Sequence, residues 1–233
     1  MPIKPMQSLE EQRLHAAHAS GGISNNIIYN RIIEIIKDCN LGGSALDYGA
    51  GIGILTRRLL GLGRFEQICG ADILPRPEDL PSAIPWYCLD LNNGEVPAAS
   101  FDAVIAVEVI EHLENPRQVA REWYRILKPG CTLILSTPNN ESIRSLVALL
   151  VRGHYAAFGD DSYPAHITAL LRQDVVRILS EAGFSDVRFR FTNSGGVPKL
   201  PGVSWQQVSF GLLKGCRFSD NLIATAVKHS AHQ

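Results

Sequence analysis

The sequence predicts an α/β fold in which a mostly parallel sheet carries helices on both faces. Strand-like apolar runs alternate with segments whose apolar residues recur at helical spacing. The run 101–107 is almost continuously apolar, which is typical of a central strand buried on both faces. A strand at 44–48 leads through a glycine-rich turn into a helix. Ligands of such sheets bind beyond the carboxyl ends of the strands, so we expect the site in the loops after the first five strands.

Seven strands and the helices between them follow in order along the chain. Isoleucines at helical spacing predict a helix over 24–39, and the helix after the glycine turn should end at Gly61 and Gly63. Pro116 suits the first turn of another helix, and Lys128-Pro129-Gly130 predicts its end. The strands are expected at 44–48, 67–73, 86–91, 101–107, 131–137, 187–192 and 222–228, and the remaining helices at 142–152, 172–182 and 205–213.

Length and composition fit one domain over residues 1–233, with N-terminal helices within 1–40 and an insertion that could form a lid at 140–170. The net charge of −1 provides no overall basic field, so a nucleic-acid partner is not favoured. Five cysteines without a C-x-x-C pair favour a reducing cytoplasm. Residues 1–10 contain no apolar signal core, and no stretch nears the ~20 apolar residues that would span a bilayer. We therefore expect a cytoplasmic protein.

The glycine turn predicts the kind of ligand that the sheet binds. Asp47 is followed by Gly49, Gly51 and Gly53, which permit positive φ and a close approach of a ligand to the backbone. A dinucleotide site needs a small residue where Ile54 stands, so a nicotinamide dehydrogenase is excluded. The carboxylate of Asp47 suits a cationic ligand group better than a phosphate.

Two further acids close the next two strands at the same edge of the sheet. Asp72 lies about 20 residues beyond the glycines, where a carboxylate can accept both hydroxyls of a ribose. A solvated acid at a strand end is the alternative. Asp90 either contacts the same ligand or caps the turn into Asn92-Asn93-Gly94.

These segments resemble class I S-adenosylmethionine-dependent methyltransferases. The likeness extends to Phe101-Asp102-Ala103-Val104 and to the passage 125–133, where Cys131 replaces a second glycine. It implies a Rossmann-like seven-stranded sheet in the order 3-2-1-4-5-7-6 and S-adenosylmethionine as cofactor. It further implies that Asp47 and the three glycines hold the methionine portion, that Asp72 holds the ribose, and that Asp90 holds the adenine. Ile73, Leu91 and Glu108 complete the predicted cofactor site.

The segment after the fourth strand contains the candidate residues for the chemistry. Glu108, Glu111 and His112 are spaced i, i+3, i+4, which would place them together on one helical turn, and His166 follows the fifth strand at the same edge. These four residues could bind a divalent metal, or His112, with Glu108 and His166, could serve catalysis as proton acceptor. Structural alternatives remain for each: His112 as a helix cap, Glu108 as a loop-orienting group, and His166 as a loop anchor.

Two methyltransferase groups are similar in this segment. O-methyltransferases of ubiquinone biosynthesis share E-V-x-E-H, here 108–112, and the strand end Ser136-Thr137-Pro138-Asn139. Small-RNA 3′-terminal 2′-O-methyltransferases share E-x-x-E-H and a later histidine in a metal site, although this chain lacks their second later histidine. The resemblance implies O-methylation of a small-molecule or lipid- or glycan-linked hydroxyl, with RNA ribose methylation as the alternative.

Three further expectations concern partners and class. Residues 140–161 carry an apolar face, which indicates either a lid that makes a peripheral membrane contact or a helix packed on the domain. A basic stripe of Arg144, Arg152, Arg172 and Arg177 along one rim would favour the RNA alternative. The chain could also be a cofactor-binding module without catalytic activity. The presence of all three acids, Asp47, Asp72 and Asp90, argues against this alternative.

Overall fold

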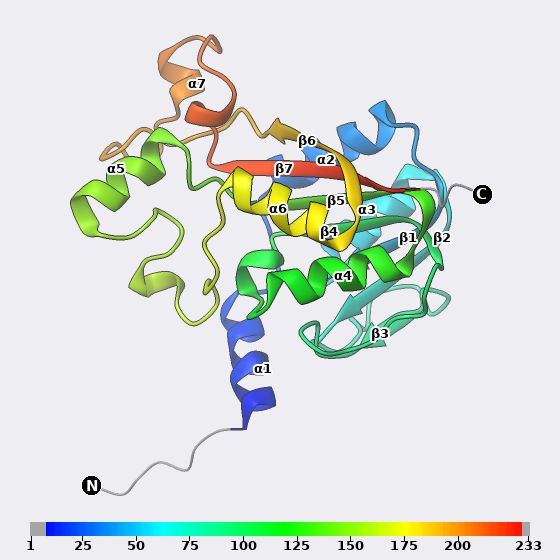
Figure 1. Cartoon of the computed structure of the whole chain (residues 1–233). Coiled ribbons are helices and arrows are strands. Elements are labelled where there is room, and N and C mark those ends of the chain that lie inside the picture. The colour runs from blue at the N-terminus through cyan, green and yellow to red at the C-terminus, as the bar shows by residue number, and fades with distance from the viewer. Residues whose placement is uncertain (1–7, 230–233) are drawn as a thin grey trace, which may run out of the picture.

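A computed structural model describes residues 8–229, and residues 1–7 and 230–233 of the predicted domain lie outside the described part. Its centre is a seven-stranded sheet in the order β3-β2-β1-β4-β5-β7-β6 (Figure 1), so the predicted order is confirmed. β1 to β5 run parallel to one another, whereas β7 runs antiparallel to both β5 and β6. The strands are β1 (Gly43–Tyr48), β2 (Phe65–Asp72), β3 (Trp86–Cys88), β4 (Phe101–Val107), β5 (Leu127–Pro138), β6 (Phe184–Phe191) and β7 (Asn221–Lys228).

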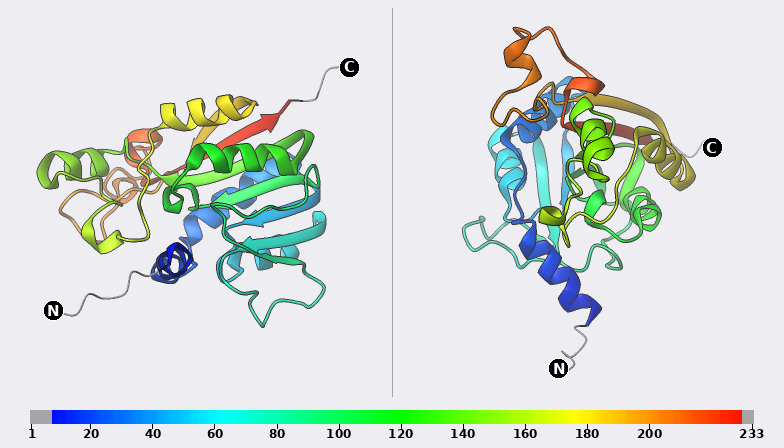
Figure 2. Two further views of the ribbon diagram at one scale, coloured as in Figure 1. Left: turned by 60° about the horizontal axis from the view of Figure 1, so that its bottom comes forward. Right: turned by 90° about the vertical axis from the view of Figure 1, so that its left-hand side faces the viewer.

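Helices cover both faces of the sheet (Figure 2). One face packs against α4 and α6, around the fully buried Trp123, and the other packs against α2 and α3. Four isoleucines of α2 are buried there, and each such side chain contributes roughly 1.5–3 kcal/mol of apolar burial. The helices are α1 (Leu9–Ala19), α2 (Asn26–Asp38), α3 (Ile54–Leu62), α4 (Pro116–Ile126), α5 (Ile143–Arg152), α6 (Arg172–Ala182) and α7 (Trp205–Val208), with short 3-10 turns η1 (Ile110–His112), η2 (Asp160–Ser162) and η3 (Cys216–Phe218).

The structure differs from the predicted boundaries at two places that matter. β5 begins at Leu127, because Leu127 pairs with Phe101 and Lys128 contacts Asp102, so the Lys128-Pro129-Gly130 segment starts the strand instead of separating it from α4. The helix predicted at 205–213 ends at Val208, because Phe210 and Gly211 have positive φ. Among residues 8–229, no helix is both long and apolar enough to cross a membrane.

The insertion after β5 contains α5, η2 and the loops up to residue 171. α5 buries Ser145 and Ala148, while its last turn exposes Leu150 and Val151. The helix is therefore packed on the domain along one side and open at its C-terminal end. The buried side agrees with a helix packed on the domain, and the lid with a membrane contact stays a prediction.

Candidate active site

The glycine turn between β1 and α3 has little room for any side chain. Gly49, Gly51 and Gly53 have φ of 78°, 53° and 77°, a region that glycine enters without steric cost. A Cβ on Gly49 would lie 2.3 Å from Cγ2 of Val109, and one on Gly51 would lie 2.2 Å from the backbone oxygen of Gly22. The segment that follows α1 therefore crosses directly over the turn, and Ile52 N donates a hydrogen bond to that same oxygen.

Asp47 and Asp72 lie beside this turn and are both buried. Asp47 is 1% exposed, and its Oδ2 accepts a 2.6 Å hydrogen bond from Thr56 Oγ1. Burial raises the pKa of Asp47 to about 7, because desolvation disfavours the charged form, and the nearby carboxylate of Asp72 adds to the rise. Asp72 accepts hydrogen bonds from Gly51 N at 2.7 Å and Leu74 N at 2.8 Å, and burial raises its pKa as well. Each carboxylate keeps lone pairs for a ligand.

Asp90 lies two residues beyond β3 and takes one of its two predicted roles, that of a cap for the following turn. Its Oδ1 accepts hydrogen bonds from the backbone N and the side-chain amide of Asn92, so it does cap the turn. Its Oδ2 forms a 2.5 Å ion pair with Arg13 of α1, and Arg13 also pairs with Glu114 at 2.8 Å. α1 has no buried residue, and these two ion pairs connect it to this edge of the site.

A single cavity of about 520 Å³ joins these groups to the segment after β4. This is an ordinary size for a small-molecule or cofactor site. Its wall includes α1 on one side and residues 163–167 of the insertion on the other. The predicted site residues that line it are Asp47, Gly49, Gly51, Asp72, Ile73, Asp90, Leu91, Glu108, His112 and His166. Gly53 is instead the N-cap of α3, and Glu111 is buried behind the wall.

The prediction that Glu108 shares a helical turn with Glu111 and His112 is wrong. Glu108 has a φ of 54°, and only residues 110–112 form a 3-10 turn. Its carboxylate points toward β5 and β7, where Ser136 Oγ and Asn221 Nδ2 each donate a 2.8 Å hydrogen bond. Burial raises the pKa of Glu108 to about 7. The left-handed backbone at residue 108 breaks the helical periodicity that the i, i+3, i+4 spacing assumes.

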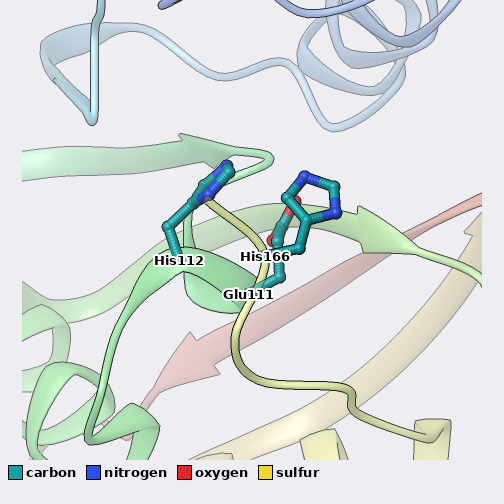
Figure 3. A group of neighbouring side chains, drawn as sticks. All are labelled: Glu111, His112 and His166. Atoms are coloured by element: carbon teal, nitrogen blue, oxygen red, sulfur yellow. The ribbon is translucent and has the colours of Figure 1, made fainter. Parts of the chain in front are cut away.

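Glu111, His112 and His166 lie close together (Figure 3), with potential ligand atoms within 4.8 Å of one another. The two histidines line the cavity, whereas Glu111 does not. The imidazole rings of His112 and His166 meet nearly edge to face, with centroids 4.8 Å apart. Nδ1 of His112 lies 2.7 Å from the oxygen of Ala165, and Nδ1 of His166 lies 2.6 Å from that of Ala157. A carbonyl oxygen only accepts, so each Nδ1 carries the proton and each Nε2 keeps its lone pair.

This donor set fits a divalent metal ion. Burial lowers the pKa of His112 to about 4 and lowers that of His166, which keeps both rings neutral as metal ligands must be. Glu111 is 0% exposed, and its Oε1 has no hydrogen-bond partner among residues 8–229, although Thr137 Oγ1 donates to Oε2 at 3.0 Å. A buried carboxylate oxygen without a partner is costly unless a ligand satisfies it. Histidines held through Nδ1–H by backbone carbonyls are the usual support of a metal site. Glu108 lies outside the group of three.

Several residues of the site were not predicted. Arg13 and Asn221 reach Asp90 and Glu108 across separations of 77 and 113 residues, for which the sequence contains no local signal. For Ser136 and Thr137 the sequence does contain a usable signal, because the end of β5 must lie beside the end of β4 in a parallel pair. Their hydroxyls contact Glu108 and Glu111.

A seven-stranded Rossmann-like sheet with acids at the ends of its first strands and a glycine turn defines the class of S-adenosylmethionine-dependent methyltransferases. A model of the methyltransferase domain family matches residues 25–188, which are 164 of the 233 residues, and the chain belongs to this family. The cofactor of the family is S-adenosylmethionine, and the buried carboxylate of Asp47 suits the cofactor's cationic amino group.

Similar curated proteins are named ubiquinone biosynthesis O-methyltransferase. The one of Idiomarina loihiensis is 25% identical over 164 residues, which cover 66% of this chain and 67% of that protein. The one of Xanthomonas oryzae pv. oryzae is 31% identical over 162 residues, which cover 61% of this chain and 66% of that protein. The chain thus spans about two thirds of the length of these relatives.

Solved structures share the fold at low identity. A methyltransferase of Archaeoglobus fulgidus has a TM-score of 0.61 at 20% identity, covering 88% of this chain and 95% of that one. The 1,6-didemethyltoxoflavin-N1-methyltransferase of Burkholderia thailandensis, solved with S-adenosylhomocysteine, has a TM-score of 0.62 at 12% identity, covering 98% and 93%.

Proposed function

We propose that this chain transfers the methyl group of S-adenosylmethionine to a hydroxyl oxygen of a small-molecule or lipid- or glycan-linked acceptor. The observation that carries the proposal is that one cavity joins the three acids to the pair of histidines. The name of the curated relatives supports O-methylation. The cofactor brings its own leaving group and activated methyl, so the chain has to bind, align and deprotonate the acceptor.

The residues at the first three strand ends would hold the cofactor. Asp47 would pair with its amino group, and the backbone of Gly49 and Gly51 would allow the methionine portion to approach the turn. Asp72 would accept the ribose hydroxyls through the lone pairs that Gly51 N and Leu74 N leave. Asp90 would accept the adenine amino group, with Ile73 and Leu91 against the nucleoside.

Glu111, His112 and His166 would hold a divalent metal at the acceptor end. Such an ion supplies positive charge that favours the deprotonated form of an acceptor hydroxyl. The Nδ1–H bonds to Ala165 and Ala157 orient both imidazoles with Nε2 available. Glu108, held by Ser136 and Asn221, places a second carboxylate on the cavity wall, where it could receive the acceptor's proton.

The insertion after β5 would select the acceptor. Tyr163, Pro164, His166 and Ile167 form the wall opposite α1. Ile167 N and Thr168 N donate to the backbone oxygen of Glu111 at 3.0 and 2.9 Å, so this wall is tied to the metal-binding residues. A bound acceptor would lie between the insertion and the methyl donor.

The RNA alternative receives less support from the arrangement of charge. Three arginines of the predicted stripe are paired with acids: Arg144 with Asp220 at 2.7 Å, Arg172 with Glu141 at 2.7 Å and Arg177 with Asp174 at 3.7 Å. These pairs neutralise most of the positive charge that phosphate binding would need.

Methyl-labelled S-adenosylmethionine tests the proposal. We would incubate the protein with each of three acceptors: small phenols, a lipid extract and short RNA. Label in an ether of a phenol or lipid, dependent on added divalent ion and lost in His112→Ala, is the expected result. Label in RNA ribose would establish the alternative, and S-adenosylmethionine binding without transfer to any hydroxyl would contradict the proposal.

A further inference from the structure

The segment between β6 and β7, residues 192–220, stands out from the edge of the sheet (Figures 1 and 2). We call it the β6–β7 excursion. It exposes large apolar side chains to an unusual degree: Phe210 is 96% exposed and Leu212 is 83% exposed, with Val208 and Leu200 about half exposed. Isolated exposed apolar residues are ordinary, but Val208, Phe210 and Leu212 lie together at one tip.

The tip is braced. The side-chain amide of Gln206 donates to the backbone oxygens of Leu213 at 2.7 Å and of Phe218 at 2.9 Å. Gln206 also accepts from Gly195 N at 3.0 Å, and Trp205 packs edge-on against Phe218. These contacts hold Trp205 and Phe218 half-buried against each other, whereas Phe210 remains almost fully exposed. The exposure of Phe210 is thus part of a defined structure, and its φ of 51° is an uncommon conformation for an aromatic residue.

The charged side chains of the excursion before Asp220 are all basic. Between Asp186 and Asp220 the sequence contains no acid. Lys199 stands next to Leu200, and Lys214 follows Leu212 and Leu213, so a cation accompanies each exposed apolar group. Neither lysine forms an ion pair with any residue of 8–229. Apolar tips beside uncompensated lysines complement a surface whose interior is apolar and whose outer layer is anionic.

We propose that the tip of the β6–β7 excursion inserts into the headgroup region of a bilayer that contains anionic lipids. Phe210 and Leu212 would enter the boundary with the acyl chains, and Lys199 and Lys214 would contact the anionic headgroups. This surface lies outside the cavity and uses none of the residues that hold cofactor or acceptor.

Vesicle flotation of the full chain tests this. We expect binding to vesicles of phosphatidylcholine with phosphatidylglycerol, little binding to phosphatidylcholine alone, and weaker binding as salt rises. The double variant Phe210→Asn/Leu212→Ser should lower the partition coefficient by about tenfold or more. Asparagine suits the positive φ at residue 210, so the fold should persist. Lys214→Ser should lower binding about fivefold on anionic vesicles alone.

Leu9→Ser is the matched control, because Leu9 is about half exposed on α1, at the opposite end of the molecule in Figure 1. It should leave vesicle binding unchanged. Unchanged unfolding temperature and S-adenosylmethionine affinity in the double variant show that its effect is local. Absence of binding to anionic vesicles, or equal binding by the double variant, would overturn the proposal. A dimer in sedimentation velocity that the double variant abolishes would show instead that a second copy covers the tip.

Discussion

Replacing Asp47 by asparagine should separate the cost of burying this carboxylate from its use in binding. In the unfolded chain its pKa is near 3.8, and burial raises the folded value to about 7. The contribution of Asp47 to stability therefore falls as the pH rises from 4 to 7 and stays level above 7, because the unfolded chain releases the proton first. The difference between the two pKa values corresponds to about 4 kcal/mol of lost stability at pH 8.

Asparagine has nearly the same shape and keeps an oxygen for the hydrogen bond from Thr56. Its buried amide adds a cost of about 1–3 kcal/mol if it finds no partner. We expect the cofactor-free variant to be about 1–3 kcal/mol more stable than the wild type at pH 8 and to lose this advantage by pH 5. We also expect its S-adenosylmethionine affinity to fall at least tenfold, because a charge-assisted bond contributes about 1.5–3 kcal/mol.

Urea unfolding of the cofactor-free proteins at both pH values and calorimetric titration with S-adenosylmethionine measure the two effects. Asp102→Asn is the control of opposite sign: burial acts to raise its pKa, but hydrogen bonds from Lys128 and Ser44 hold it at about 2. That variant should lose stability at pH 8. An Asp47→Asn variant that is less stable than the wild type at pH 8, or that binds the cofactor as tightly, would refute the reasoning.

Three further changes probe the turn, α1 and the proposed metal ligands. Gly51→Ala should lower stability by about 2 kcal/mol and impair cofactor binding, since its Cβ would meet the backbone of Gly22, whereas Gly61→Ala, with open space, should be neutral or stabilising in thermal unfolding. Arg13→Ala should speed hydrogen exchange over 9–19 and cofactor release, because α1 has no buried residue; unchanged exchange would count against this. His166→Ala should weaken Zn²⁺ or Mn²⁺ binding at least tenfold while cofactor affinity persists, and equal metal titrations would remove it from the site.

Periodicity predicted the type of nearly every element, because apolar spacing records which face a segment buries. Periodicity failed where the backbone leaves the φ/ψ regions of helices and strands. Glu108 and Phe210 have positive φ, so a helical reading through either residue places the following side chains wrongly. Strand order came from resemblance to a family, since contacts between distant strands leave no periodic signal.

The candidate site was predictable to the extent that it lies at strand ends. Asp47 and Asp72 follow from parallel topology, since strand ends meet at one edge. The tautomers of His112 and His166 could not be predicted, because each depends on a carbonyl that a loop delivers from elsewhere in the chain. The ion pair of Arg13 with Asp90 joins two side chains with no sequence relation at all.

The placement of Asn221 at the start of β7 has a consequence for the order in which the molecule is completed. During synthesis the strands β1 to β5 and all three acids emerge well before residue 221, and only β7, inserted last between β5 and β6, brings the amide that fixes Glu108. A nascent or C-terminally shortened chain would thus lack the Asn221 amide, and the carboxylate of Glu108 would keep only the hydrogen bond from Ser136. Because Asn221 also lines the cavity, the cavity would be complete only after β7 joins the sheet.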